Sequence, residues 1–203
     1  MVSFDEQAIL DNGAYIYNQR DEIERIADEI CEKGFDSIFF TSSGGSLAMM
    51  QPFDYMVSVM SDIPVQSQVS ADFLTVGNRR IGKGTLAFMA SKSGDTKETV
   101  AAAKAAKDAG CTIVSTLGVD GSPLGELSDY GVIYKQGRPM ELVLYLLIGK
   151  ILKNRGFFDD YDRFADELVN LPAALVSVGK NADEMARAYA LKHKDDPYQI
   201  WIG

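Results

Sequence analysis

The chain has 203 residues, of which 46% are hydrophobic and 24% are charged, a composition typical of a soluble globular protein that can bury a core. Its net charge of −9 and pI near 4.6 argue against a nucleic-acid partner, because nucleic-acid-binding surfaces need clustered Lys and Arg. The longest apolar stretch, residues 142–152, contains a glycine and a lysine and is too short to span a bilayer, so we expect no membrane partner.

The N-terminal residues and the two cysteines indicate the cellular compartment. Residues 1–11 include Asp5 and Glu6, where a secretion signal would have a basic segment and an apolar core. Cys31 and Cys111 have neither the spacing of metal ligands nor the density of a disulfide scaffold. We therefore expect a cytoplasmic protein with two buried thiols and no metal site.

The first predicted helix spans residues 21–32. Its apolar residues recur at helical spacing, and Lys33-Gly34 is a typical end signal. The apolar positions are Ile23, Ile26, Ala27 and Ile30. The preceding residues 4–17 are less regular, and Gly13 makes a continuous helix there doubtful.

A strand, a hydroxyl-rich turn and a helix are predicted next. Residues 36–40 form a short apolar segment that indicates a buried strand. The turn from Thr41 to Ser46 leads into a helix that we expect Ser46 to cap. Within the turn lie Ser43, Gly44 and Gly45. The helix has an apolar face, and Pro52 is expected to kink the helix or delay its start.

Residues 64–70 partly alternate between apolar and polar side chains and predict a second strand. Residues 77–80 follow as a polar turn that contains Arg79 and Arg80. We favour a solvated loop for these arginines over a phosphate or partner contact, since surface charges are usually just solvated.

A second strand–turn–helix unit has the same chemistry as the first. An apolar strand at residues 84–90 is joined to a predicted helix at residues 95–109 by Ser-Lys-Ser-Gly-Asp-Thr. Such a turn lies at the carboxyl end of a strand, where ligands of open α/β sheets bind and where the first helical amides lack intrahelical partners.

The residues of this second turn predict phosphate recognition. Ser91, Ser93 and Thr96 supply hydroxyl donors, and Gly94 allows close approach of the backbone. The alternative is a plain serine N-cap, which such a sequence supplies whether or not a ligand binds.

The remaining elements complete the fold class. Residues 112–117 predict a fourth strand, residues 124–127 a short helix and residues 131–135 a fifth strand. Strands that alternate with helices indicate an α/β fold with a five-stranded parallel sheet flanked by helices on both faces. The chain has no Gly-x-Gly-x-x-Gly after its first strand and no Gly-Lys-Ser/Thr, so we expect no nicotinamide or P-loop nucleotide and no cofactor.

The C-terminal third contains one weak catalytic candidate. Glu141, in a helix predicted at residues 139–153, is either an acid–base carboxylate or, as we favour, a carboxylate stabilised by the helix dipole. His193 lies in a charged segment and is expected to be solvated. Residues 182–194 predict a further helix and residues 198–203 an apolar strand.

The two turns together resemble the sugar isomerase (SIS) domain family, over about residues 35–152. In that family a Ser-x-Ser-Gly-Glu/Asp-Thr loop cradles the phosphate of a hexose or pentose phosphate, and a serine ends the first glycine turn. Gly45 stands where relatives have Thr, which implies that one hydroxyl contact is missing or replaced by backbone. The resemblance implies these phosphate-binding residues: Ser43, Gly44, Gly45, Ser46, Ser91, Ser93, Gly94 and Thr96.

The resemblance also implies a flavodoxin-like three-layer sandwich and a domain order. The expected order is an N-terminal helical lead-in at 1–34, a phosphosugar-binding domain at 35–178, a connecting helix at 179–197 and the first strand of a second, missing domain at 198–203. In tandem members, such as fructosamine or glucoselysine 6-phosphate deglycases and the isomerase half of glucosamine-6-phosphate synthase, the catalytic Glu and a ring-opening His lie in or after the second domain. The catalytic residues of this chain therefore stay unassigned.

The expected function is to bind a phosphorylated sugar or amino sugar within an aldose–ketose isomerase or an Amadori-product deglycase that forms a homo-oligomer. Whether the N-terminal helix covers its own sheet or packs against a partner subunit stays open. One alternative is a non-catalytic sugar-phosphate sensor, although sensors of the family carry a basic helix-turn-helix segment and the acidic N-terminus here has none. Another is a dimerisation module in which the hydroxyl turns are only helix caps.

Overall fold

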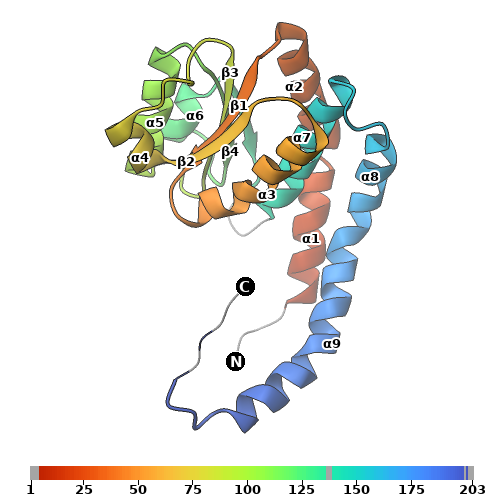
Figure 1. Ribbon diagram of the computed structural model, residues 1–203. Helices are drawn as coiled ribbons and strands as arrows, with labels where there is room; N and C mark the ends of the chain where they lie inside the picture. The colour runs from red at the N-terminus through yellow and green to blue at the C-terminus, as the bar shows by residue number, and fades with distance from the viewer. Residues whose placement is uncertain (1–4, 136–138, 199, 201–203) are drawn as a thin grey trace.

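The computed structural model describes residues 5–135, 139–198 and 200. Five strands in these ranges form one parallel sheet in the order β2-β1-β3-β4-β5 (Figure 1). The strands are β1 (Ser37–Ser42), β2 (Val65–Val69), β3 (Thr85–Ser91), β4 (Thr112–Leu117) and β5 (Tyr130–Ile133). The predicted α/β fold with a five-stranded parallel sheet is therefore confirmed.

Helices cover both faces of the sheet, which makes three layers. One face is covered by α4 (Ser70–Val76), α5 (Lys97–Asp108) and α6 (Pro123–Leu127), and the other by α2 (Arg20–Lys33), α3 (Gly45–Met60) and α7 (Met140–Asn154) (Figure 1). Successive side chains of β1 point to opposite faces. Phe39 contacts the ring of Phe73 in α4 at a centroid distance of 5.2 Å, whereas the ring of Phe40 lies 5.3 Å from that of Phe88 in β3, in the core on the opposite face of the sheet. Two separate hydrophobic cores result.

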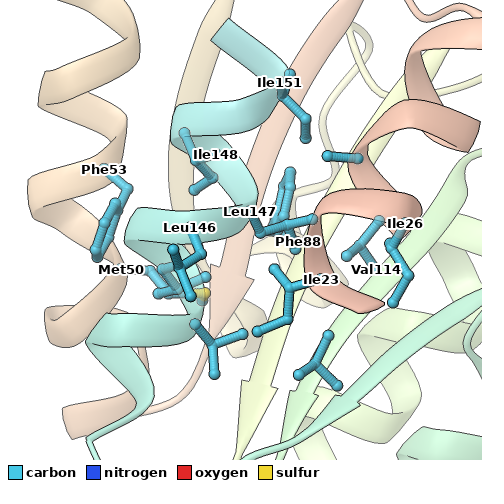
Figure 2. Packing of buried hydrophobic residues seen from close by; sticks show 14 of the residues in the cluster. Ile23, Ile26, Met50, Phe53, Phe88, Val114, Leu146, Leu147, Ile148 and Ile151 are labelled. Atoms are coloured by element: carbon cyan, nitrogen blue, oxygen red, sulfur yellow. The ribbon is translucent and has the colours of Figure 1, made fainter. Parts of the chain in front are cut away.

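The larger core lies under α2, α3 and α7. Figure 2 shows side chains from these three helices converging on the sheet around Phe88 of β3 and Val114 of β4. Ten of the fifteen residues of α7 are buried, so this helix is the central element of its layer. This burial within the protein explains why the sequence of α7 is nearly continuously apolar. No helix in the described ranges is long and apolar enough to cross a membrane.

Helices α1 (Glu6–Tyr17) and α9 (Leu171–Lys192) form an arm that projects from the α/β body (Figure 1). The sequence made a continuous helix at residues 4–17 doubtful because of Gly13, but α1 is continuous through this residue. A Cβ atom at Gly13 would lie 2.0 Å from Cγ of Pro172, so the glycine permits direct packing of the two helices. The helix predicted at 182–194 is the second half of α9, which begins much earlier.

A short helix, α8 (Tyr161–Glu167), and a 3-10 turn, η1 (Leu168–Asn170), connect the body to the arm. Tyr161 is fully buried, and its hydroxyl lies 3.0 Å from the carbonyl oxygen of Leu146 and 3.1 Å from the carboxylate of Glu24. Arg20 pairs with Glu24 at 2.5 Å and with Asp166 at 2.6 Å. These contacts tie α8 to α2 and α7.

Two other predicted elements differ from the structure or lie beyond it. The prediction that Pro52 delays the start of its helix is wrong, because α3 begins at Gly45. Pro52 lies inside the helix and is exposed. Of the strand predicted at residues 198–203, only Tyr198 and Ile200 fall within the described residues, and neither is in a strand.

Candidate functional site

The two hydroxyl- and glycine-rich turns leave the sheet side by side. They follow β1 and β3, which are neighbouring strands although β2 lies between them in the chain. The chain therefore reverses its direction across the sheet between β1 and β3, which is the position where ligands bind in open α/β sheets. The hydroxyl of Ser42, at the end of β1, donates to the carbonyl oxygen of Ala90 in β3 at 2.5 Å and joins the two strand ends.

Internal hydrogen bonds hold the turn after β3. The Ser91 hydroxyl accepts a hydrogen bond from the amide of Gly94 at 2.9 Å and lies 3.0 Å from the Thr96 hydroxyl. The Gly94 carbonyl accepts from the amide of Leu124 at 2.9 Å. Ser91 is only 1% exposed. In this conformation Ser91 organises the turn from inside.

Gly94 cannot be replaced without strain. Its φ of +74° lies in the left-handed region, which L side chains rarely adopt. A Cβ atom built there would lie 2.2 Å from both Cβ and Oγ of Ser122. The sequence predicted that Gly94 allows close approach of the backbone. In the structure, one side of this glycine packs against Ser122, in the loop after β4.

The Ser93 side chain is exposed and makes no hydrogen bond to any residue in the described part of the chain. The N-cap of α5 is Thr96, which makes no side-chain hydrogen bond to the first turn of the helix. The interpretation of this turn as a plain serine N-cap is therefore wrong. The first-turn amides of α5 lack a side-chain acceptor, and the hydroxyl of Ser93 is open to a ligand.

The turn after β1 has the same open arrangement. The N-cap of α3 is Gly44, with φ of +55° and no side chain to cap the helix, and Ser46 lies in the first turn instead of capping it. The expectation that Ser46 caps α3 is therefore wrong. The hydroxyl of Thr99 in α5 donates to that of Ser43 at 3.5 Å and links the two turns.

A cavity of about 410 Å³ lies at these turns. Its walls include Ser43, Gly45 and Ser46 from the first turn and Lys92 from the second, and its remaining lining residues are Met49, Tyr134 and Met140. The structure thus brings three of the predicted residues into one cavity, whereas Gly44, Ser91, Ser93, Gly94 and Thr96 are not among its lining residues. Sequence reasoning missed Tyr134, since a tyrosine at the end of an edge strand carries no local signal. Lys92 is inside the recognised motif and could have been found there.

Glu141 lines a second cavity, of about 520 Å³, between α7 and the arm. That cavity is mostly apolar, and Met49 lines both cavities. Tyr134 has a pKa raised above its ordinary value, first by burial and then by the negative charge of Glu141. The weak catalytic candidate therefore influences the first cavity only indirectly.

The other polar candidates lie away from these turns. Arg79 and Arg80 are exposed in the turn before β3, at the opposite end of that strand. His193 ends α9 and lies 2.8 Å from the carboxylate of Asp196. No group of three or more His, Cys, Asp and Glu side chains in the described ranges is arranged to hold a metal ion.

Comparison with known proteins agrees with this geometry. The model of the SIS domain family matches residues 33–147. Glutamine–fructose-6-phosphate aminotransferase from Thermotoga maritima is 31% identical over 183 residues, which cover 84% of this chain and 30% of that protein. Fructosamine deglycase FrlB from Bacillus subtilis is 27% identical over 179 residues, which cover 83% of this chain and 55% of the enzyme. The chain thus spans about a third to a half of the length of these relatives.

A solved structure supports the fold. The chain superposes on a candidate phosphosugar isomerase from Salmonella typhimurium with a TM-score of 0.81 at 24% identity, covering 87% of this chain and 56% of the other. At this level of identity the likeness shows the fold alone.

Proposed function

Because this chain belongs to the SIS domain family, we propose that it binds the phosphate of a phosphorylated sugar between the turns after β1 and β3. One observation carries the proposal: helices α3 and α5, on opposite faces of the sheet, begin at these two adjacent turns without a side-chain cap. Their first-turn amides and positive dipole ends suit a phosphate, and Ser46 and Ser93 add hydroxyl donors. Lys92 supplies a local positive charge in a chain of net charge −9.

We propose that the ligand is a sugar phosphate handled by an isomerase or a deglycase. The proposal is supported by the relatives, which are named for fructose-6-phosphate aminotransfer and fructosamine deglycation. Both reactions move protons near a sugar carbonyl and need acid–base groups. Among the described residues that line the first cavity, only Lys92 and Tyr134 are ionisable, so we propose that further catalytic groups come from outside this set.

That sparse set of ionisable groups also favours a second candidate function, a sugar-phosphate sensor that binds without catalysis. Titration calorimetry with fructose 6-phosphate, fructose and inorganic phosphate tests the binding that both functions share. We expect the phosphorylated sugar to bind at least about tenfold more tightly than fructose, because the phosphate makes charge-assisted hydrogen bonds. Equal affinity for the two sugars would contradict the proposed function. Conversion of fructose 6-phosphate to its aldose isomer, or release of the amine from a fructosamine 6-phosphate, would distinguish an enzyme from a sensor.

We also propose that the chain self-associates through α9. Apolar side chains recur on this helix every three or four residues: Leu175, Val178, Ala182, Met185 and Tyr189. Val178 is 64% exposed and Met185 72% exposed, and such an exposed apolar stripe indicates an interface. Leu175 and Tyr189 lie equally far from Ala182, so a second, antiparallel copy presents a matching stripe about a two-fold axis.

We propose a reducing cytoplasm as the compartment, on the basis of two free thiols. Cys111 is buried, but the expectation of burial is wrong for Cys31, which is half-buried. Burial raises the pKa of both thiols, which keeps them protonated and unreactive.

A further inference from the structure

The cavity of about 520 Å³ between α7 and the arm contains none of the residues from the turns after β1 and β3. Its walls come from the beginning of α7, from α1 and α9 of the arm, and from Met49 of α3 (Figure 1). Its volume is within the usual range for small-molecule sites, about 300–1,000 Å³. Leu175, on the arm, is 50% exposed, so the cavity borders solvent on that side. A small molecule therefore has both the room and the access to bind there.

The lining of this cavity combines apolar side chains with one carboxylate. Seven of the nine described lining residues are apolar, and the two polar ones are Asn12 and Glu141. Glu141 makes no hydrogen bond or ion pair through its side chain with any residue in the described part of the chain. It lies in the first turn of α7, where the helix dipole favours a negative charge. The cavity thus has apolar walls and one negative charge without a counter-charge among the described residues.

This combination determines the kind of ligand that fits. A carboxylate that is removed from water loses hydration free energy, which only an opposite charge or a hydrogen-bond donor can compensate. An anionic ligand is repelled by Glu141, and a neutral hydrocarbon leaves its carboxylate without a partner. An aliphatic ammonium ion satisfies both parts of the lining, because its alkyl chain is buried against the apolar walls while its N–H groups donate to the carboxylate.

We propose that the cavity between α7 and the arm binds a free primary aliphatic amine as its ammonium ion, with the alkyl chain against Ile9, Leu142 and Leu175 and the charge at Glu141. This site is separate from the proposed phosphate site, although Met49 lines both cavities. The inference therefore goes beyond the proposed function and does not depend on it. It assigns Glu141 a binding role and no proton transfer.

NMR titration of the wild-type protein with hexylamine, ethylamine, 1-hexanol and hexanoate at neutral pH tests the inference. An alkylamine is protonated under these conditions, since its pKa is close to that of lysine, about 10.4. We expect hexylammonium to bind at least about tenfold more tightly than ethylammonium, because its longer chain buries more methylene groups. It should also bind at least about threefold more tightly than hexanol or hexanoate, because only the ammonium ion pairs with a carboxylate.

Glu141→Gln removes the negative charge and keeps nearly the same side-chain size. It should weaken hexylammonium binding by about three- to tenfold and change hexanol binding by less than about twofold. Glu126→Gln is the matched control, because Glu126 is a carboxylate in the first turn of α6, on the opposite face of the sheet and outside the cavity. The control should leave both affinities unchanged. A thermal melt of each variant confirms that the comparison is made on folded protein.

Four results would overturn the inference. They are no binding of hexylammonium, equal affinity for hexylammonium and hexanol, equal affinity for hexylammonium and ethylammonium, and an equal effect of Glu141→Gln and Glu126→Gln. An affinity for hexylammonium that falls as the protein concentration rises would also contradict it, because a second copy of the chain would then occupy the cavity. The titrations contain no sugar phosphate, so failure of the proposed phosphate site would leave every expected result unchanged.

Discussion

The hydroxyls of Ser91 and Thr96 lie 3.0 Å apart, across the base of the turn that connects β3 to α5. Because Ser91 also accepts the amide hydrogen of Gly94, the first serine of the Ser-x-Ser motif serves the turn itself. Ser93 is exposed and has no such contact. The two serines of one motif therefore have separable roles, and their variants should fail in different measurements.

Ser93→Ala should weaken fructose 6-phosphate binding by about ten- to a hundredfold and leave the melting temperature unchanged. The side chain has no intramolecular hydrogen bond to lose, whereas a hydroxyl bound to a phosphate contributes about 1.5–3 kcal/mol. Ser91→Ala is the contrasting variant. It leaves the buried amide of Gly94 without its acceptor and should lower the free energy of unfolding by about 1–3 kcal/mol. A Ser93→Ala protein that melts early yet binds as before would show that Ser93 is structural.

Gly94→Ala should destabilise the protein by about 2–4 kcal/mol in urea unfolding, because a side chain there is both strained and in collision with Ser122. Gly121→Ala is the matched control: its φ is +62°, but a Cβ atom would meet nothing within 4 Å. That variant should lose only about 1 kcal/mol, from backbone strain alone. Adding Ser122→Gly to Gly94→Ala removes the colliding atoms and should recover part of the loss. Equal losses for the two glycine variants would refute the steric explanation.

Tyr161→Phe should reduce stability at neutral pH by about 1–2 kcal/mol, and this difference should shrink above pH 10. The folded protein raises the pKa of Tyr161 far above its ordinary value of 10.0, first through burial and then through the charge of Glu24. A raised pKa in the folded state means that the stabilisation is complete below the unfolded pKa and is lost as pH rises beyond it. In the wild type, this one group lowers the free energy of unfolding by about 1.4 kcal/mol per pH unit between the two pKa values. A phenylalanine cannot ionise, so in the Tyr161→Phe variant residue 161 adds no such pH dependence to the free energy of unfolding.

Urea unfolding of both proteins at pH 7, 9, 10 and 11 measures the effect. The other tyrosines and the lysines titrate in both proteins, so the difference between the two curves isolates Tyr161. A difference that stays constant or grows between pH 9 and pH 11 would show that Tyr161 is not held in its protonated form.

Met185→Glu should shift the protein toward the monomer, because it places a charge in the middle of the apolar stripe on α9. Light scattering coupled to size-exclusion chromatography gives the mass of each species. Protein concentrations from about 5 to about 200 µM cover the range in which weak self-association is detected. Ser177→Glu is the control, since this exposed residue lies on α9 outside the stripe. A wild-type protein that is monomeric throughout, or a Met185→Glu protein that associates as before, would exclude this interface.

Local patterns were sufficient to predict the five strands and the two hydroxyl- and glycine-rich turns, because β2 partly alternates between apolar and polar residues and the other strands contain short apolar runs. What local patterns missed depends on contacts between distant residues. The continuity of α1 follows from the packing of Gly13 against Pro172, and a sequence window around Gly13 shows only a poor helix former. Tyr134 lines one cavity with residues of the turns after β1 and β3, and Glu141 lines another with residues of the arm, and neither grouping can be predicted from neighbouring residues in the sequence. The capping role expected of Ser46 failed because α3 begins two residues earlier than expected, with Gly44 as its N-cap.

The contact between Gly13 and Pro172 joins α1 to the beginning of α9, which bears on the order in which the molecule assembles. A contact between such distant residues requires most of the chain to be ordered first, since closing a long loop costs entropy before any packing is gained. The α/β body, built from neighbouring strand–helix units, can form before this closure. Docking of α1 against α9 is then a late folding step, and the amides of the arm should exchange with solvent through openings that leave the sheet intact.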